Sequence, residues 1–510
     1  MEHSFALDRE DLFCTDLLTK PLPGNGKILV TGASGYVGGR LVRELHARGY
    51  RVRVMVRDKA FLYQDLWPDA EVVIADALKY ETLGAALEGI HTSFYLIHSL
   101  LLGPQDFHDA DNDAARNFIR AAEENNVKRV IYLGGLGDVT TKLSDHLSSR
   151  IQVAEELNKG NVPVTVLRAA IIVGSGSAPY EIIKHIVTKI AVINVPALAN
   201  NRCQPIAIRD ATKYLVGCLE TPATSGKSFD IGGNDILSYR QMMEVFAVIM
   251  GKKRIFVSLP FSNLNFYSYI ASLITPVPAP IINSLIEGLK NEVVCQNDSI
   301  RRIIPFETLT YQEALERALL REKQDRVYSR WSDAYPKNHS LALKLHELGK
   351  LPYYTASYSI ITKKSASSLF ASFCRVGGKE GWFEANWMWW VRGMADRLLM
   401  GVGSQRGRRS EADLKINDVI DFWRVEEIRQ NQRLLLRAEM KLPGRGWLEF
   451  MIMPQDDGKN KLFIMLYYDT DTLAGMLYWY IFLPFHNLIF NSMIKQIEKR
   501  SLSSDTSESE

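Results

Sequence analysis

The chain has 510 residues, of which 46% are hydrophobic and 23% are charged, and its formal net charge is +3. This length suffices for about two to four domains, and the composition is that of a globular protein rather than of a disordered chain or a protein with many membrane spans. A chain so close to neutral lacks the basic excess that drives non-specific binding to nucleic acid, so no nucleic-acid partner is expected.

Residues 1–26 are expected to form an arm before the first domain. They begin MEHSFALDREDLF, with acids where a secretory signal peptide carries an apolar run, so export is not expected. The cysteines are odd in number and scattered, and none lies in a Cys-x-x-Cys or Cys/His spacing, so we predict reduced thiols, a cytoplasmic location and no metal site. The five are Cys14, Cys203, Cys218, Cys295 and Cys374.

From Lys27 to about residue 255, short β-branched runs alternate with helical patterns. KILVTG, YRVRVMVR, VVIAD, TSFYLIHS and VKRVIYLGG predict strands, and VPVTVLRAAII and SFDIGG predict two more. Strands separated by helices in this way indicate βαβ units and a parallel sheet. The fold class expected for this part is therefore α/β, a doubly wound parallel sheet.

The strongest local motif is TGASGYVGGRLV, which lies between the first predicted strand and the first predicted helix. Its glycines let the backbone turn tightly and approach a pyrophosphate, whose charge then lies at a helix N-terminus. The glycine pattern alone is weak, but its strand–turn–helix context favours dinucleotide binding over a merely structural turn. The predicted cofactor-binding residues of this motif are Gly32, Ser34, Gly35, Tyr36, Val37 and Gly38.

The next strands end in residues that suit other parts of a dinucleotide. Arg57 stands where an NAD-selective protein usually carries an acid, so it favours the 2′-phosphate of NADP, with a solvated arginine as the alternative. Asp76, with Ala77 after it, is placed to meet the adenine edge, although an Asp that opens a turn is also common. His98 and Ser99 follow the fourth strand, where open α/β sheets bind ligands, so either could contact the nicotinamide half or only form a loop hydrogen bond.

Residues 256–325 are expected to continue this domain as its substrate region. No charged residue lies between Arg254 and Glu287, a span that competes in length with the roughly 20 residues of a membrane helix. Four prolines between residues 260 and 280 break any such helix, so a membrane span is not expected here.

A polar connection over residues 326–351 precedes a second domain, residues 352–500, in which the pattern changes. YTASYSII predicts a strand, KSASSLFASFC and EANWMWWVRGMADRLLM predict helices, and four long strand candidates follow without helices between them. Turn signals separate those candidates, which indicates an antiparallel meander. We expect an α+β helix-grip fold, in which a curved sheet holds a long C-terminal helix, and a disordered tail over residues 501–510.

Two features of the second domain leave alternatives open. The C-terminal helix has no charged residue between Asp471 and Lys495, but its Pro, His and Asn residues favour a helix on the sheet or on a membrane surface over a membrane span. Arg406, Arg408 and Arg409 form a basic loop that is expected to be solvated, with contact to an anion or a lipid headgroup as the alternative.

The glycine motif resembles the TGA[ST]GxxG fingerprint of the atypical, extended (NmrA-like) branch of the short-chain dehydrogenase/reductase superfamily. Blocks such as FYLIHSL, HLSSRIQVAEEL, LRAAIIVGSGSA, TPVPAPIINSLIEGLKNEVV and YWYIFLPFHNLIF are similar to those of a bacterial group of uncharacterised NAD(P)-binding proteins. That group joins a reductase-like half to a C-terminal domain of unknown function similar to START/SRPBCC folds. The resemblance covers residues 27–500 and implies a Rossmann domain, a START-like domain and NADP or NAD as cofactor, but no reaction.

The chain departs from the superfamily at the catalytic positions. Typical members carry a Ser or Thr after the fifth strand and a Tyr-x-x-x-Lys on the next helix, whereas this chain has LGGLGD and His146-Leu-Ser-Ser-Arg150. A histidine can donate a proton near neutral pH, and Arg150 one turn later can hold the nicotinamide ribose. The alternatives are an altered, non-redox site and a solvent-facing helix start with Ser144 or Asp145 as its cap.

Helix-grip domains enclose apolar ligands, and here one follows a predicted NADP site and two long uncharged segments. We therefore expect an NADP-dependent oxidoreductase that acts on a small apolar substrate such as a lipid, an isoprenoid or a quinone. The alternative is a redox-inactive, NADP-sensing binding or scaffold protein. The expected location is the cytoplasm, with peripheral contact at the inner membrane left open.

Overall fold

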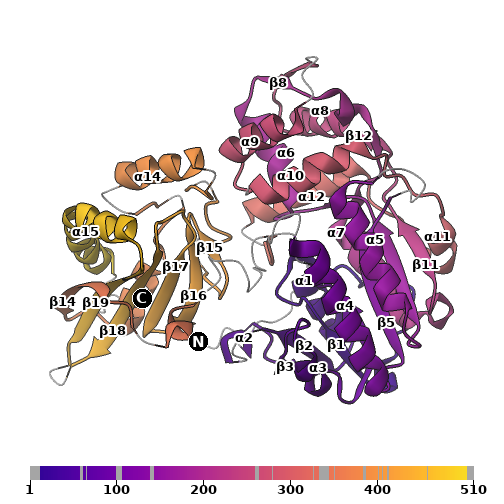
Figure 1. The fold of residues 1–510 in the computed structure, drawn as a ribbon, viewed down its shortest axis with the longest axis horizontal. Helices are drawn as coiled ribbons and strands as arrows, with labels where there is room; N and C mark the ends of the chain where they lie inside the picture. Colours follow the sequence, from indigo (N-terminus) through magenta and orange to yellow (C-terminus); the bar gives the residue numbers. More distant parts are fainter. Residues whose placement is uncertain are drawn as a thin grey trace, which may run out of the picture. The chain divides into compact units, whose positions relative to one another are not determined.

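The computed structural model describes residues 12–57, 61–64, 66–98, 106–137, 143–258, 263–277, 279–324, 327–331, 344–349, 351–378, 380–382, 386–399, 401–404, 406–410, 413–455 and 458–501. The chain divides into two compact units, Met1–Pro336 and Lys337–Glu510. Figure 1 shows an α/β first unit and a second unit with one sheet and few helices.

The first unit is built on a seven-stranded sheet in which every pair of neighbouring strands is parallel. Its strands are β1 (Lys27–Val30), β2 (Val52–Val56), β3 (Glu71–Ile74), β4 (Ile90–Tyr95), β5 (Arg129–Gly135), β6 (Val164–Ala169) and β11 (Ser228–Ile231). The order across the sheet is β11-β6-β5-β4-β1-β2-β3, so the winding direction reverses between β1 and β4. Ligands of doubly wound sheets bind at this switch point, beyond the carboxyl ends of the strands.

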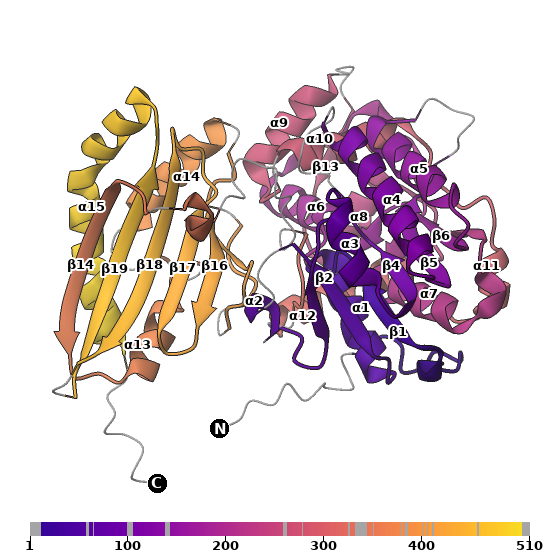
Figure 2. The same ribbon diagram turned by 60° about the horizontal axis from the view of Figure 1, so that its bottom comes forward.

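Helices cover both faces of this sheet, which explains why its central strands are apolar runs rather than alternating patterns (Figure 2). The helices α3, α4 and α5 pack side by side, and α1 packs against α7. The helices around the sheet are α1 (Tyr36–Ala47), α2 (Phe61–Gln64), α3 (Tyr80–Leu87), α4 (Asp106–Glu124), α5 (Asp145–Asn158) and α7 (Ile208–Glu220). The predicted doubly wound α/β domain is confirmed.

The rest of the first unit forms a smaller helical layer with short strand pairs. The uncharged stretch before Glu287 is divided among one strand and two short helices, as its prolines predict. The elements are β7 (Ile172–Val173), α6 (Ala178–Lys189), β8 (Val192–Asn194), β9 (Arg202–Cys203), β10 (Ile206–Ala207), β12 (Leu237–Ser238), α8 (Tyr239–Ile249), β13 (Ile255–Val257), α9 (Leu264–Ile274), α10 (Ala279–Glu287), α11 (Ser299–Ile303) and α12 (Tyr311–Lys323).

The described part of the second unit has a six-stranded antiparallel sheet and three α-helices, and the predicted meander is confirmed. Its elements are β14 (Tyr354–Thr362), α13 (Ala366–Phe373), α14 (Asn386–Leu398), β15 (Val419–Ile420), β16 (Trp423–Arg429), β17 (Arg433–Ala438), β18 (Arg445–Pro454), β19 (Asn460–Asp469) and α15 (Leu473–Arg500). The strand order is β14-β19-β18-β17-β16-β15 (Figure 2).

One face of this sheet forms the core of the second unit. Leu434 and Leu436 of β17 and Phe450 of β18 point to that face, where Trp479 and Phe490 of α15 pack in the same cluster. Alternate residues of the same strands therefore point to the opposite face. Helix α15 has Pro484 in its interior.

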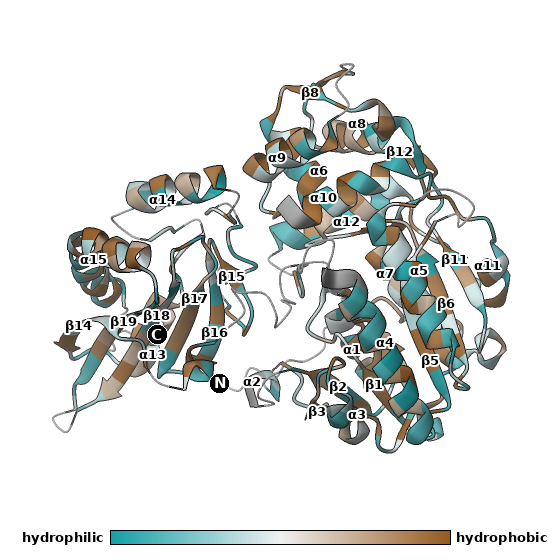
Figure 3. Ribbon diagram, in the orientation of Figure 1, coloured by the Kyte–Doolittle hydropathy of each residue, from teal (hydrophilic) through white to brown (hydrophobic). Residues whose placement is uncertain are grey.

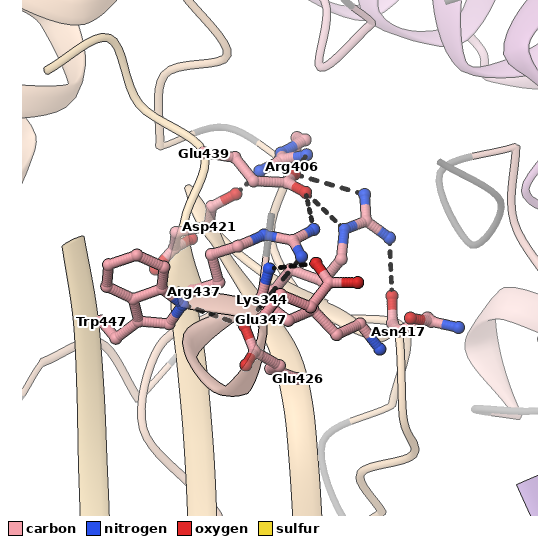
Figure 4. Close-up of polar contacts among 10 residues, drawn as sticks. Lys344, Glu347, Arg406, Asn417, Asp421, Glu426, Arg437, Glu439 and Trp447 are labelled. Atoms are coloured by element: carbon pink, nitrogen blue, oxygen red, sulfur yellow. Dashed lines mark hydrogen bonds and ion pairs between the residues drawn. The ribbon is translucent and has the colours of Figure 1, made fainter. Parts of the chain in front are cut away.

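The opposite face carries a buried ionic cluster (Figure 4). Glu439 accepts hydrogen bonds from Arg406 at 2.6 Å and from Arg424 at 3.2 Å, and Arg437 lies 3.4 Å away. No side chain of this set is more than 5% exposed. Burial alone raises the pKa of the Glu439 carboxyl, but the charges of Arg424 and Arg406 outweigh it and hold that pKa well below its usual range.

The prediction that the loop with Arg406, Arg408 and Arg409 is solvated is therefore wrong. Arg406 and Arg409 are buried, and Arg409 pairs with Asp418 at 2.7 Å. Arg408 donates a hydrogen bond of 2.6 Å to the backbone carbonyl of Cys374. The three guanidinium groups bind protein oxygens, so they hold the second unit together.

Glu439→Gln is expected to destabilise the second unit by about 3–5 kcal/mol at pH 7, because it leaves buried guanidinium groups without their carboxylate. The folded-state pKa is lowered, so the wild-type advantage is complete above the usual carboxyl pKa and is lost as the pH falls through the folded pKa. Urea unfolding followed by tryptophan fluorescence measures the free energy of unfolding of the second unit, since seven of the nine tryptophans lie after residue 336.

A matched control is Asp469→Asn, which removes an exposed ion pair with Arg445 in the same unit. It should cost less than about 1 kcal/mol. Equal effects of the two substitutions would contradict the structural role of the cluster.

Candidate functional site

A cavity of about 740 Å³ lies at the switch point of the parallel sheet and extends into the small helical layer. Every residue predicted for the site lines it, whereas Ser99 lies outside the described residues. These residues are Gly32, Ser34, Gly35, Tyr36, Val37, Gly38, Arg57, Asp76, Ala77, His98, His146 and Arg150.

The glycine turn at one end of the cavity depends on the absence of side chains. Gly32 has φ +63°, and a Cβ there would lie 2.5 Å from the carbonyl oxygen of Leu96. A Cβ on Gly38 would lie 2.3 Å from the carbonyl oxygen of Gly32. Gly35 is the N-cap of α1, so no side chain caps the first amides of the helix. This cradle fits the pyrophosphate of a dinucleotide.

The residues that follow β2 and β3 line a second part of the cavity. Arg57 is exposed on the rim of the cavity. Asp76 accepts a hydrogen bond of 3.1 Å from the amide of Leu78, and its own amide donates to Thr82 at 3.0 Å. The turn before α3 is thus fixed while Asp76 still lines the cavity.

Two histidines meet beyond the carboxyl ends of β4 and β5. The rings of His98 and His146 are 5.1 Å apart, centroid to centroid. Nδ1 of His98 lies 3.2 Å from the carboxylate of Asp111, which is 3% exposed, whereas Nε2 is buried and has no hydrogen-bond partner in the described part of the chain. Burial and the charge of Arg150 lower the pKa of His98, and Asp111 opposes that shift.

The pair at Asp111 assigns the tautomer of His98. A carboxylate accepts a hydrogen bond from Nδ1–H, so the neutral ring donates there and keeps a lone pair on Nε2. Sequence reasoning missed Asp111, although a signal exists: the acid stands on the same stripe of α4 as the buried Ala114, Ala115 and Phe118.

Arg150 is held against the end of β5. Its guanidinium donates a hydrogen bond to the carbonyl of Leu133 and lies 5.4 Å from the ring centroid of Tyr132. A Cβ on Gly134 would lie 2.9 Å from that ring, and one on Gly135 would lie 3.3 Å from Cβ of Arg150. Gly135 thus allows α5 to approach β5 closely, and Gly134 leaves room for the ring of Tyr132.

The other end of the cavity is apolar. Helices α6, α9 and α10 supply much of it, and Figure 3 shows hydrophobic colouring on α9 and α10. None of the described lining residues from Ala169 onward in the sequence is charged. Examples are Ile182, Ile186, Met243, Phe266, Ile270, Leu285 and Trp331.

The last of these residues comes from a segment that the sequence analysis assigned to the connection between domains. Residues 327–331 belong to the first unit, where Ser329 donates a hydrogen bond of 2.7 Å to the carbonyl of Tyr36. The amide of Trp331 donates to the carbonyl of Gly176 at 2.9 Å. Among the described residues, no group of three or more His, Cys, Asp or Glu is placed to hold a metal ion.

Comparison with protein families decides the identity of the first unit. Residues 24–299 match the model of the NmrA-like family. The chain belongs to the NmrA-like family. Residues 350–493 match a second model, described as a protein of unknown function (DUF2867). The predicted NmrA-like, NAD(P)-binding reductase type and the predicted C-terminal domain of unknown function are confirmed.

Several known proteins are similar to the NmrA-like part. Photosystem II assembly factor Ycf39 of Trieres chinensis is 24% identical over 48% of this chain and 75% of its own length. A ceramide reductase of Caulobacter vibrioides is 26% identical over 46% of this chain and 74% of its own length. The solved Citrobacter triphenylmethane reductase complexed with NADP(H) is 18% identical, covers 57% of this chain and 99% of its own, and has a TM-score of 0.47.

Gly38→Ala is expected to weaken NADPH binding at least tenfold, because the added methyl group pushes the glycine turn apart. Titration of the full chain with NADPH, followed by its fluorescence, measures this. Gly84→Ala in α3 is the control, since a Cβ there meets nothing within 4 Å, and it should leave affinity unchanged. A Gly38→Ala protein that folds and binds NADPH like wild type would rule out the cradle.

Proposed function

We propose that the first unit is an NADP-dependent oxidoreductase that reduces an apolar substrate such as a lipid, an isoprenoid or a quinone. The observation that carries this proposal is the uncharged wall of the cavity beyond the two histidines. Such a wall favours an apolar molecule, which gains by leaving water, and disfavours a charged one, which would have to be desolvated without a partner. The similar ceramide reductase is named for a substrate of this class.

The glycine cradle holds the pyrophosphate in this proposal, and Arg57 meets the 2′-phosphate. When bound, NADPH supplies a hydride. Arg150, fixed by the carbonyl of Leu133, orients the ribose beside the histidines. The apolar helices exclude water from the substrate.

His146 and His98 move the proton. His146 is the proton donor, and His98, 5.1 Å away between ring centroids, replaces the proton through a ring that Asp111 orients. Asp111 is a positioning residue, because it acts on His98 rather than on the substrate. The lowered pKa of His98 keeps most of its population neutral at pH 7, so the ring can accept a proton as well as pass one on.

A redox-inactive, NADP-sensing protein is the second candidate. It is favoured by Gly134 and Gly135, whose close packing leaves no place for the hydroxyl that typical members use. For the second unit we propose a START-like helix-grip domain. Its support is the antiparallel sheet with the 28-residue helix α15 on its apolar face.

Arg57→Ala is expected to weaken NADPH binding about tenfold and to leave NADH binding nearly unchanged, because a charge-assisted contact with the 2′-phosphate is lost. Calorimetric titration with both cofactors measures the two affinities. Arg51→Ala is the control, since this exposed arginine precedes the same strand at its other end. A fall in both affinities, or in neither, would remove the role of Arg57 in selecting NADP.

His146→Phe is expected to abolish NADPH oxidation while cofactor affinity stays within a few-fold. Asp111→Asn should reduce turnover and move the alkaline limb of the pH–rate profile to lower pH, because the carboxylate that raises the pKa of His98 is gone and the ring loses its proton at lower pH. Menadione, decylubiquinone and trans-2-dodecenal are suitable acceptors, and NADPH absorbance reports turnover.

Full activity of His146→Phe would move the proton donor to another residue. Tight NADPH binding by wild type without turnover of any acceptor would instead support the NADP-sensing protein.

A further inference from the structure

Helix α15 has an apolar face that is exposed. Its large side chains at Leu473, Leu477, Tyr480, Ile481 and Leu488 are between 54% and 70% exposed. At 100° per residue they fall on one side of the helix, opposite the side that Trp479, Phe490 and Met493 bury against the sheet. A surface helix of a soluble protein normally turns a polar face outward, so this face requires an explanation.

Helix α14 adds a second exposed apolar stripe. Trp387, Trp390, Val391, Met394 and Leu398 are between 44% and 65% exposed, and their spacing places them on one side of this helix. On the other side of α14, Trp389 packs against Phe490 of α15, with ring centroids 6.2 Å apart. The two helices therefore lie on the same side of the sheet (Figure 2). We call these ten exposed residues the α14–α15 apolar face.

Charge marks one end of this face. No Asp, Glu, Lys or Arg occurs from Leu473 to Ile494, and the next exposed residues on the same helix are Lys495, Lys499 and Arg500. The whole second unit is basic, with 24 Lys and Arg against 20 Asp and Glu after residue 336. An apolar surface with Trp and Tyr rings and cations at its end is complementary to an anionic lipid surface, where such rings lie at headgroup level.

The packing of α15 argues against a transmembrane helix. By length and a mean hydropathy of 1.3, α15 is the one helix among the described residues that could cross a membrane, and 22% of its most apolar 18 residues are buried. Its inner side contributes Phe490 and Met493, each 1% exposed, to the core of the second unit. A crossing would pull these side chains out of that core, whereas lying on a bilayer keeps them in place.

We propose that the α14–α15 apolar face docks the second unit on an anionic lipid bilayer, with both helices lying in the interface. This proposal rests on the second unit alone and is independent of the proposed reductase activity. The main competing occupant is a second copy of the chain, because Asp471 precedes a helix whose last turn carries Lys499 and Arg500, and antiparallel copies could pair these ends.

The test is co-sedimentation of the full chain with vesicles of phosphatidylcholine alone and with 30% phosphatidylglycerol. We expect binding to the anionic vesicles that weakens with salt, and at least tenfold weaker binding by the double variant Leu477→Gln/Ile481→Gln. Both side chains are exposed, so the fold should persist. Val248→Gln is the matched control, since it removes an apolar side chain that is 80% exposed in the first unit.

Two further measurements distinguish a lipid bilayer from a second copy of the chain on the α14–α15 apolar face. Vesicles should shift the tryptophan emission to the blue in wild type, and less so after Trp387→Phe/Trp390→Phe. Light scattering reports the oligomeric state: a dimer that the double variant dissociates, without vesicle binding, would overturn the proposal in favour of a second copy. A wild-type protein that is monomeric and does not bind the anionic vesicles would overturn the proposal outright. Protein in cell membranes that resists carbonate and needs detergent for release would show that α15 is inserted instead.

Discussion

The buried guanidinium of Arg40 joins three distant parts of the first unit around one end of the cavity. It donates hydrogen bonds to the carbonyls of Tyr36 at 3.0 Å, Ser175 at 2.9 Å and Ser329 at 3.1 Å. This one cation thus binds the glycine turn, the start of the apolar helical layer and the end of the first unit. Hydrogen bonds from a buried charge are strong and costly to break, so the shape of the cofactor end depends on this contact.

Electrostatic asymmetry is the second property of the cavity. The histidines, Arg150 and Asp111 are gathered at the carboxyl ends of β4 and β5, whereas the wall beyond them has no charge among its described residues. Because Asp111 is buried, a proton on His98 interacts strongly with this carboxylate. In the proposed reductase, the apolar end would hold the substrate and the end at the sheet would supply the proton.

Much of this arrangement could be predicted from the sequence because it depends on local patterns. Strands buried on both faces appear as apolar runs, and the glycines at Gly32 and Gly38 are demanded by contacts within the motif and with the adjacent strand. Asp111 and Trp331 could not be placed in the same way, since their roles depend on partners brought close by the tertiary fold. The prediction of a solvated arginine loop was wrong for the same reason. Arginines in a loop are usually solvated, and it is Glu439, distant in the sequence, that makes burial of Arg406 favourable.

Pro484 limits how deeply α15 can enter any apolar surroundings. A proline has no amide hydrogen, so the carbonyl oxygen of Tyr480 lacks the donor that the helix would normally supply one turn later. Both residues lie on the exposed side of the helix. An unsatisfied carbonyl in hydrocarbon costs several kcal/mol, so this oxygen must stay within reach of water or another donor. On the proposed lipid surface, Pro484 would therefore keep the middle of α15 at the water–lipid interface and out of the hydrocarbon.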